Sequence, residues 1–224
     1  MKQLLYLSLV LMLSLVSCTN SEEEEQRYSC NEEANLWVKK NLREIRTLTR
    51  SEWLDIPNQN YQRAAYIAFK PKQKLDFWLE KFEDVLQLNW NAAERQHIKA
   101  IHDFLRENPY VFQDECSDEE QRQFDLFIYE WSDMAIKELN WSQELVASLI
   151  ATGYPMIDIQ GSVQMPKQVN TLQARSECDC HRGNVAFIWC GGSTLSSYCA
   201  QSSCSGSSKG CGALWQESCD GACE

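Results

Sequence analysis

The sequence predicts a mainly α protein, a bundle of five or six helices followed by a small, loop-rich C-terminal domain held by disulfides. Residues 29–153 carry apolar side chains at helical spacing, with repeated helix-start signals. Eight of the eleven cysteines lie between Cys178 and Cys223. A segment so rich in cysteine buries little apolar surface, and cross-links that restrict its unfolded state are the expected source of its stability.

Residues 1–17 are predicted to be a signal peptide. Lys2 is followed by an apolar run over residues 4–16, which is short for a membrane span. Residues 15–18, Leu-Val-Ser-Cys, resemble the lipobox of bacterial lipoproteins, in which the cysteine is lipidated and becomes the first mature residue. We therefore expect lipidation at Cys18, with several acyl chains forming a stable membrane anchor. An ordinary cleaved signal peptide is the alternative.

Residues 18–28 are predicted to be an acidic tether, with four glutamates at positions 22–25. This stretch is similar to the one that follows the lipidated cysteine in surface-exported lipoproteins, which favours an outer-membrane, lipid-anchored protein at the cell surface. A plain spacer fits as well. Without the signal peptide the chain has 20 basic and 32 acidic residues. Such an acidic protein is a poor partner for nucleic acid.

The bundle is predicted over residues 29–153. Ser29 and Glu32 form the pattern of a capping box before a first amphipathic helix. Pro57 and Asn58 interrupt the chain before a short helix over residues 61–69. Pro71 suits the first turn of the next helix. The apolar stripe of that helix consists of Leu75, Trp78, Leu79, Phe82, Val85 and Leu86.

Three further helix starts follow in the second half of the bundle. Asn91 with Glu94, and Ser117 with Glu120, have the spacing of capping boxes. Asn108-Pro109 is expected to stop the helix that begins at Asn91. Ser142 is predicted to cap the last helix, and Gly153 to end it.

No motif in the bundle indicates an enzyme, a cofactor or a metal site. His97 and His102 share a predicted helix but stand five residues apart, which does not bring two imidazoles to one metal. We expect no catalytic residues. Cys30 and Cys116 are the bundle's only cysteines, and either they form a disulfide with each other or both remain free, buried thiols.

Residues 154–176 are predicted to be a linker and residues 177–224 the disulfide-rich domain. The sequence leaves the cysteine pairing open. Two other uses of these cysteines are a metal site at Cys178-x-Cys180-His181 and thiol redox chemistry, although C-x-x-C spacing is lacking. Residues 185–189 are predicted to form a strand. Three apolar side chains, Tyr198, Leu214 and Trp215, are expected to fill this domain's own small core, or else to present an exposed membrane- or receptor-contacting face.

The C-terminal domain has a distinctive order of short motifs. They are C-D-C at 178–180, V-A-F-I-W-C at 185–190, C-x4-C, G-C-G-A-L-W at 210–215, and C-x3-C. In these motifs the domain resembles the bacteriocin fulvocin C-related family. The resemblance implies a bacteriocin-like domain with four bridges and no catalytic residues. The bridges would join Cys178, Cys180, Cys190, Cys199, Cys204, Cys211, Cys219 and Cys223.

By this resemblance the protein would act against other bacteria, through a surface receptor or after release of the domain. From Glu177 onward two basic residues stand against five acidic ones, a net charge of −3. Attraction to anionic lipid is therefore not expected, and a receptor is the favoured target. The alternative is a non-toxic, surface-exposed lipoprotein whose cysteine-rich domain binds a ligand or protects the bundle.

Overall fold

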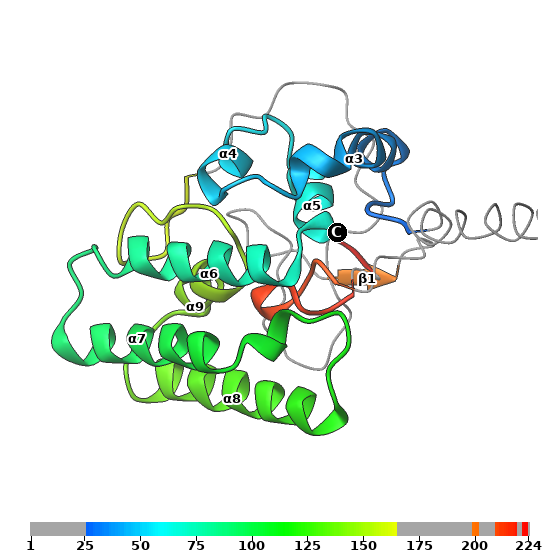
Figure 1. Ribbon diagram of the computed structural model, residues 1–224. Coiled ribbons are helices and arrows are strands. Elements are labelled where there is room, and N and C mark those ends of the chain that lie inside the picture. The colour runs from blue at the N-terminus through cyan, green and yellow to red at the C-terminus, as the bar shows by residue number, and fades with distance from the viewer. Residues whose placement is uncertain (1–25, 165–198, 202–208, 219–220, 224) are drawn as a thin grey trace, which may run out of the picture.

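The computed structural model describes residues 26–164, 199–201, 209–218 and 221–223, and over these residues the protein is mainly helical (Figure 1). The described part contains seven α-helices, one more than the largest number expected. Several predicted features lie outside the described residues. They are the predicted signal peptide with Cys18, most of the predicted linker, the strand expected at 185–189, Tyr198, and most side chains of the predicted cysteine-rich domain.

The N-cap of the first helix, α3 (Glu32–Ile45), lies two residues later than predicted. Asn31 is the N-cap, and its side chain accepts a hydrogen bond from the Ala34 backbone N–H at 2.9 Å. The prediction of a capping box at Ser29 was wrong, because the Ser29 hydroxyl instead accepts from the Asn31 backbone N–H at 3.1 Å. Both residues are good caps, and the local spacing alone did not separate them.

A short helix, α4 (Arg50–Leu54), was not predicted. It has a complete capping box, in which Glu52 accepts from the Thr49 backbone N–H at 2.7 Å. Five residues are too few to show an apolar period, which explains the omission. Its Trp53 is fully buried and donates from Nε1 to the Gln62 carbonyl at 2.6 Å.

The remaining helices begin where the sequence predicted, within two residues. They are α5 (Gln59–Ala68), α6 (Pro71–Val85), α7 (Ala92–Glu107), α8 (Asp118–Lys137) and α9 (Gln143–Ile150), with the 3-10 helix η1 (Pro109–Phe112) between α7 and α8. Asn91 and Ser117 form the predicted capping boxes, and Ser142 caps α9. The last helix ends at Ile150 rather than at Gly153.

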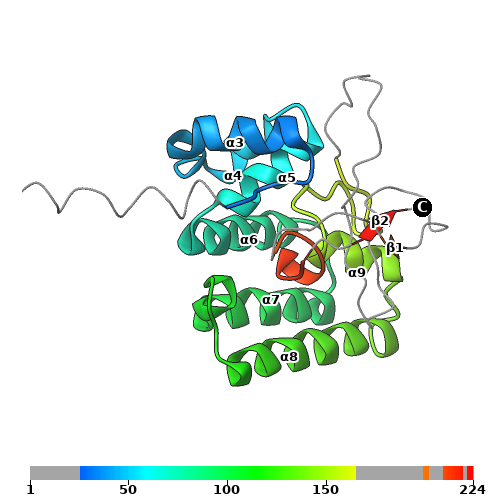
Figure 2. The same ribbon diagram turned by 90° about the vertical axis from the view of Figure 1, so that its right-hand side faces the viewer.

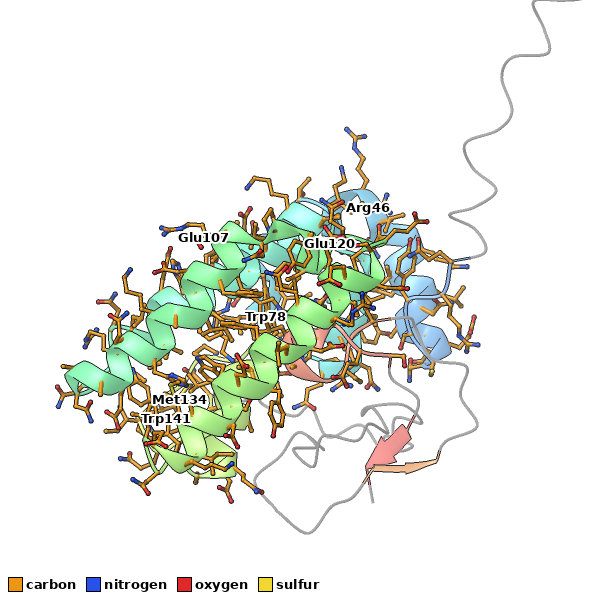
Figure 3. The ribbon with its side chains drawn as sticks, turned by 90° about the horizontal axis from the view of Figure 1, so that it is seen from below. Arg46, Trp78, Glu107, Glu120, Met134 and Trp141 are labelled. Atoms are coloured by element: carbon orange, nitrogen blue, oxygen red, sulfur yellow. The ribbon has the colours of Figure 1, made fainter. Side chains whose placement is uncertain are left out.

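Helix α6 lies at the centre of the molecule. Figure 2 shows α3, α4 and α5 on one side of it and α7 and α8 on the other. Seen from below, Trp78 of α6 is in the interior, while Arg46 and Glu107 are at the periphery (Figure 3). Two short strands, β1 (Cys199–Gln201) and β2 (Gly221–Cys223), pair antiparallel with Cys199 opposite Cys223. The described tail segment with the 3-10 helix η2 (Ala213–Trp215) lies between α6 and α7 in both views.

His97 and Trp131 join α7 to α8 through two reciprocal hydrogen bonds. His97 donates from Nε2 to the Trp131 carbonyl at 3.0 Å, and Trp131 donates from Nε1 to the His97 carbonyl at 2.9 Å. The two rings stack with centroids 4.7 Å apart. This buried histidine therefore has a structural role, and burial lowers its pKa from the ordinary 6.5.

Acidification should weaken this junction. Below pH 6.5 the unfolded chain protonates His97 more readily than the folded chain does, so the free energy of unfolding falls as the pH drops. In urea unfolding, the free energy of unfolding of His97→Gln should fall less than that of wild type between about pH 7 and pH 5. His102→Gln, on the same helix, should keep the His97 contribution. An unchanged pH dependence in His97→Gln would contradict this role.

Candidate functional site: the aromatic cluster that holds the C-terminal segment

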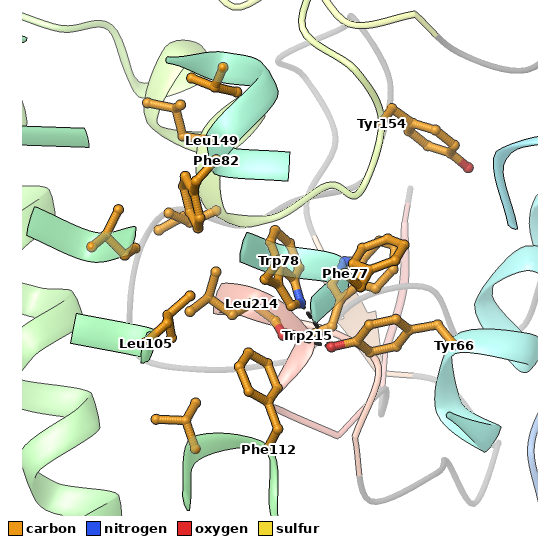
Figure 4. Close-up of a cluster of buried hydrophobic side chains, with 14 of the residues drawn as sticks. Tyr66, Phe77, Trp78, Phe82, Leu105, Phe112, Leu149, Tyr154, Leu214 and Trp215 are labelled. Carbon is orange, nitrogen blue, oxygen red and sulfur yellow. Dashed lines mark hydrogen bonds between the residues drawn. The ribbon is translucent and has the colours of Figure 1, made fainter. Parts of the chain in front are cut away.

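Part of the cysteine-rich domain lies inside the helical bundle. We call residues 209–218 the C-terminal segment. Its Leu214 is 0% exposed and its Trp215 is 5% exposed. Figure 4 shows both side chains among buried residues of the bundle, with Leu214 on the side of Leu105 and Phe112. These two side chains therefore belong to the bundle's hydrophobic core.

Four aromatic residues surround Trp215, and together we call them the aromatic cluster. They are Trp53 of α4, Tyr66 of α5, and Phe77 and Trp78 of α6. The Trp215 ring meets Tyr66 edge-to-face with centroids 4.6 Å apart, and Trp78 edge-to-face at 5.6 Å. Each such pair contributes about 0.5–1.5 kcal/mol beyond area burial. Three helices thus converge on one side chain of the C-terminal segment.

The polar groups of the Trp215, Tyr66 and Trp78 side chains all form hydrogen bonds in this contact. Trp215 donates from Nε1 to the Ala151 carbonyl at 2.9 Å. Tyr66 donates its hydroxyl to the Leu214 carbonyl at 3.2 Å, and that hydroxyl accepts from Trp78 Nε1 at 2.8 Å (Figure 4). Burial raises the pKa of Tyr66 far above its ordinary value. The cluster therefore recognises the segment by backbone and side-chain hydrogen bonds as well as by apolar contact.

The backbone of the segment is held in a closed turn. Cys211 and Glu217 exchange two backbone hydrogen bonds of 2.9 Å, and Gly210 N–H donates to the Trp215 carbonyl at 3.0 Å. Leu214 and Trp215 have φ values of 51° and 56°, in the left-handed region that costs a side chain roughly 1–2 kcal/mol. Such a conformation persists only where the surrounding contacts impose it. Here the aromatic cluster supplies those contacts.

Two buried cations fix the chain beside Trp215. Arg50 of α4 donates from Nη2 to the Gly153 carbonyl at 3.1 Å and pairs with Asp84 at 2.6 Å. Lys81 of α6 donates to the carbonyls of Ser148, at 2.7 Å, and Thr152. Burial, followed by the charge of Arg50, lowers the pKa of Lys81 well below its ordinary value. These bonds hold the residues after α9, including Ala151, where the Trp215 indole reaches them.

Charged groups lie at the edge of the contact. Lys209 donates to the Gln113 carbonyl, after η1. Lys74 of α6 is buried, and its pKa is lowered to about 8, mainly by burial. Asp114 raises that pKa and the charge of Lys209 lowers it. The charges of Asp114 and Lys209 therefore act on Lys74 with opposite signs.

The free energy of unfolding should rise with pH through the Lys74 contribution. Above about pH 8 the folded protein releases this proton, whereas the unfolded chain keeps it until about 10.5. The unfolded state therefore binds more protons in that interval, and stability increases with pH. Lys74→Met should reduce the increase between about pH 8 and pH 10 in denaturant unfolding. An equal increase in wild type and variant would contradict the assignment.

The structure does not pair the two bundle cysteines. Cys116 is free and exposed, whereas Cys30 is in a disulfide, so both predictions for this pair were wrong. The reason is distance in the fold. Cys30 precedes α3 and Cys116 precedes α8, and these two helices lie at opposite sides of α6 and α7 (Figure 1). Cys211 is also in a disulfide. The side chains of Cys178, Cys180, Cys190, Cys199, Cys204, Cys219 and Cys223 lie outside the described residues.

The expected role of Leu214 and Trp215 is also corrected. Neither fills a separate core of the C-terminal domain, and neither is exposed, because both pack in the bundle. Sequence reasoning missed Tyr66 as the residue that binds the Leu214 carbonyl. It treated Gly153 only as a helix end, although the hydrogen of this glycine faces Phe77 and Trp215 closely.

Comparisons with known proteins add no family assignment. No protein-family model, curated protein or solved structure matches the chain. Within residues 26–164 and the three short C-terminal stretches, no three histidine, cysteine or acidic side chains gather in a way that would hold a metal ion. Among the helices that the structure describes, none is long and apolar enough to cross a membrane. The contact between the C-terminal segment and the aromatic cluster is the feature on which a functional proposal rests.

Proposed function

We propose that this is an exported, lipid-anchored protein whose helical bundle holds a bacteriocin-like C-terminal domain in an inactive state. On exposure, the domain acts against other bacteria by binding a surface receptor. The single observation that carries this proposal is the burial of Leu214 and Trp215 in the aromatic cluster. Sequence features support the other parts of the proposal. The predicted export signal and the Cys18 lipobox support export and lipid anchoring, and the resemblance to the fulvocin C-related family supports action against other bacteria.

The buried residues belong to the most specific element of that resemblance. In G-C-G-A-L-W, the leucine and the tryptophan are the large apolar side chains, and both are enclosed by the bundle. Exposed tryptophans commonly anchor protein interfaces. A partner that binds this element competes with Tyr66 and Ala151 for the same hydrogen-bonding groups. The bundle and the receptor therefore exclude one another.

Charge supports a receptor rather than lipid as the target. The domain from Glu177 onward has a net charge of −3, and an acidic surface is repelled by anionic membranes. Buried aromatic side chains, once exposed, offer the apolar anchors that a protein receptor binds. We therefore assign recognition to Leu214 and Trp215 and not to basic residues.

Two variants test the proposal in the full-length protein. Phe77→Leu weakens the aromatic cluster and leaves the C-terminal segment intact, whereas Trp215→Ala removes the proposed anchor. Labelled proteins would be applied to related bacteria, with cell binding and growth as readouts. We expect Phe77→Leu to bind and inhibit more than wild type, and Trp215→Ala to bind less. If both variants behave like wild type, or both lose binding equally, the proposal fails.

The alternative is a non-toxic surface lipoprotein in which the C-terminal domain closes and protects the bundle. It is favoured by the contacts of Trp215, which reach three helices as those of a permanent core residue would. Under this alternative, Phe77→Leu and Trp215→Ala both lower stability, and neither gains binding to cells. Protease resistance of the bundle would fall in both variants.

A further inference from the structure

Cys30 forms a disulfide whose partner can be narrowed by elimination. The chain has eleven cysteines, and Cys116 is excluded because its thiol is free. Cys18 is excluded in the mature protein because lipidation occupies its sulfur, a step that rests on the proposed lipid anchor. The remaining candidates are the eight cysteines of the C-terminal domain. We infer that a disulfide from Cys30 ties the C-terminal domain covalently to the helical bundle.

The region around Cys30 is a fixed attachment point. Tyr28 is fully buried, and its backbone N–H donates to the Asn35 side chain of α3 at 2.9 Å. Arg27 donates to the Cys30 carbonyl at 3.3 Å, and Asn31 caps α3 directly after it. Cys30 is therefore held at the start of a well-packed helix, and a bond to it restrains whatever it joins.

The described part of the C-terminal domain contacts helix α5. Arg63 of α5 donates from Nη1 to Cys211 Sγ at 3.2 Å, and Cys211 is itself in a disulfide. Helix α5 packs against α3, the helix that follows Cys30. The C-terminal domain is thus attached to two neighbouring helices. Trp215 packs non-covalently against α5, and the inferred disulfide joins the domain to Cys30 at the start of α3.

This disulfide from Cys30 changes how the C-terminal domain can be released from the bundle. A cut between residues 164 and 177 would leave both fragments joined through Cys30. Separation also requires a dithiol reductant, whose two thiols become a disulfide while Cys30 and its partner each regain a thiol. Release therefore needs proteolysis, reduction and departure of Trp215 from the aromatic cluster. In an oxidising compartment the cut protein remains intact.

The disulfide from Cys30 also changes how many cysteines are available for bridges within the C-terminal domain. If one of the eight C-terminal cysteines bonds to Cys30, seven remain, which allows three internal bridges and leaves one thiol. The four internal bridges implied by the resemblance do not form together with this bond. The mature protein should then carry two free thiols, Cys116 and one in the C-terminal domain.

A disulfide map of the full-length protein from its native membrane tests the inference. Free thiols would be alkylated before any reduction, and peptides analysed by mass spectrometry without reduction. We expect a peptide with Cys30 joined to one from residues 178–223, and two alkylated cysteines. Alkylated Cys30 would overturn the inference. A Cys18–Cys30 peptide would overturn it together with the lipid anchor, while the cell-binding test of the aromatic cluster would stand independently.

A second measurement does not depend on the map. A protease site inserted between residues 164 and 177 allows the purified full-length protein to be cut. We expect one band on a denaturing gel without reductant and two bands with it. Cys30→Ser should give two bands without reductant, and the matched Cys116→Ser should give one. Two bands from cut wild type without reductant would overturn the tie.

Discussion

Replacing Trp215 by alanine should lower the free energy of unfolding by about 3–5 kcal/mol, the usual cost of removing a buried large aromatic side chain. The change removes ring contacts with all four residues of the aromatic cluster and the hydrogen bond to the Ala151 carbonyl. Urea unfolding of the full-length protein, followed by circular dichroism of the helices, measures the effect. The helical signal reports on the bundle. A lower free energy of unfolding in the variant would therefore show that the C-terminal segment stabilises the bundle.

Trp215→Phe is the matched control for this experiment. It keeps an aromatic ring in the cluster and removes the indole N–H that donates to Ala151. The loss of that hydrogen bond costs about 0.5–1.5 kcal/mol, and the smaller ring adds a packing cost. We therefore expect an effect between wild type and Trp215→Ala. An alanine variant as stable as wild type would mean that the segment is not bound to the bundle in solution.

Replacing Gly153 by alanine should have the second-largest effect, a loss of about 1–3 kcal/mol from overpacking. An added Cβ would stand 2.4 Å from Phe77 Cζ and 3.0 Å from the Trp215 ring. Phe77 has little freedom to move, because Trp53 and Trp78 pack against it. The new methyl group therefore pushes against the contact that holds Trp215. Faster proteolysis of the C-terminal segment should accompany the loss of stability.

A double variant identifies the cause of that loss. Phe77→Leu makes room for the added methyl group, so Gly153→Ala with Phe77→Leu should cost less than the sum of the single changes. Urea unfolding of the four proteins gives the comparison. If the two costs simply add, or if Gly153→Ala alone is neutral, the close approach of Gly153 to Phe77 does not limit the packing.

The helices could be predicted because their signals are local. Asn91 with Glu94, and Ser117 with Glu120, satisfy the first turn of a helix through residues three apart in the chain. The same chemistry was ambiguous at Ser29 and Asn31, where two good caps lie close together. Helix α4 (Arg50–Leu54) was missed although Thr49 and Glu52 form a capping box, because a five-residue helix has no apolar period.

The site could not be predicted because its contacts are non-local and its conformation is unusual. Trp215 meets Tyr66 and Phe77 across most of the chain, and no local pattern indicates such partners. Its cysteine-rich surroundings suggested a separate domain. Leu214 adopts a left-handed backbone conformation that sequence patterns assign to glycine. The prediction of a Cys30–Cys116 disulfide failed for a related reason. An oxidising compartment and an even number of cysteines in the bundle do not indicate how far apart two cysteines lie in the fold.

The docking of Trp215 in the aromatic cluster is the central claim, and proton NMR of the full-length protein in solution tests it most directly. The Trp215 and Tyr66 ring centroids are 4.6 Å apart, and Leu214 is fully buried beside them. We predict nuclear Overhauser effects between the Trp215 indole and Tyr66 ring protons, together with ring-shifted Leu214 methyl signals. Absence of these effects, with Leu214 methyls at random-coil positions, would contradict the account.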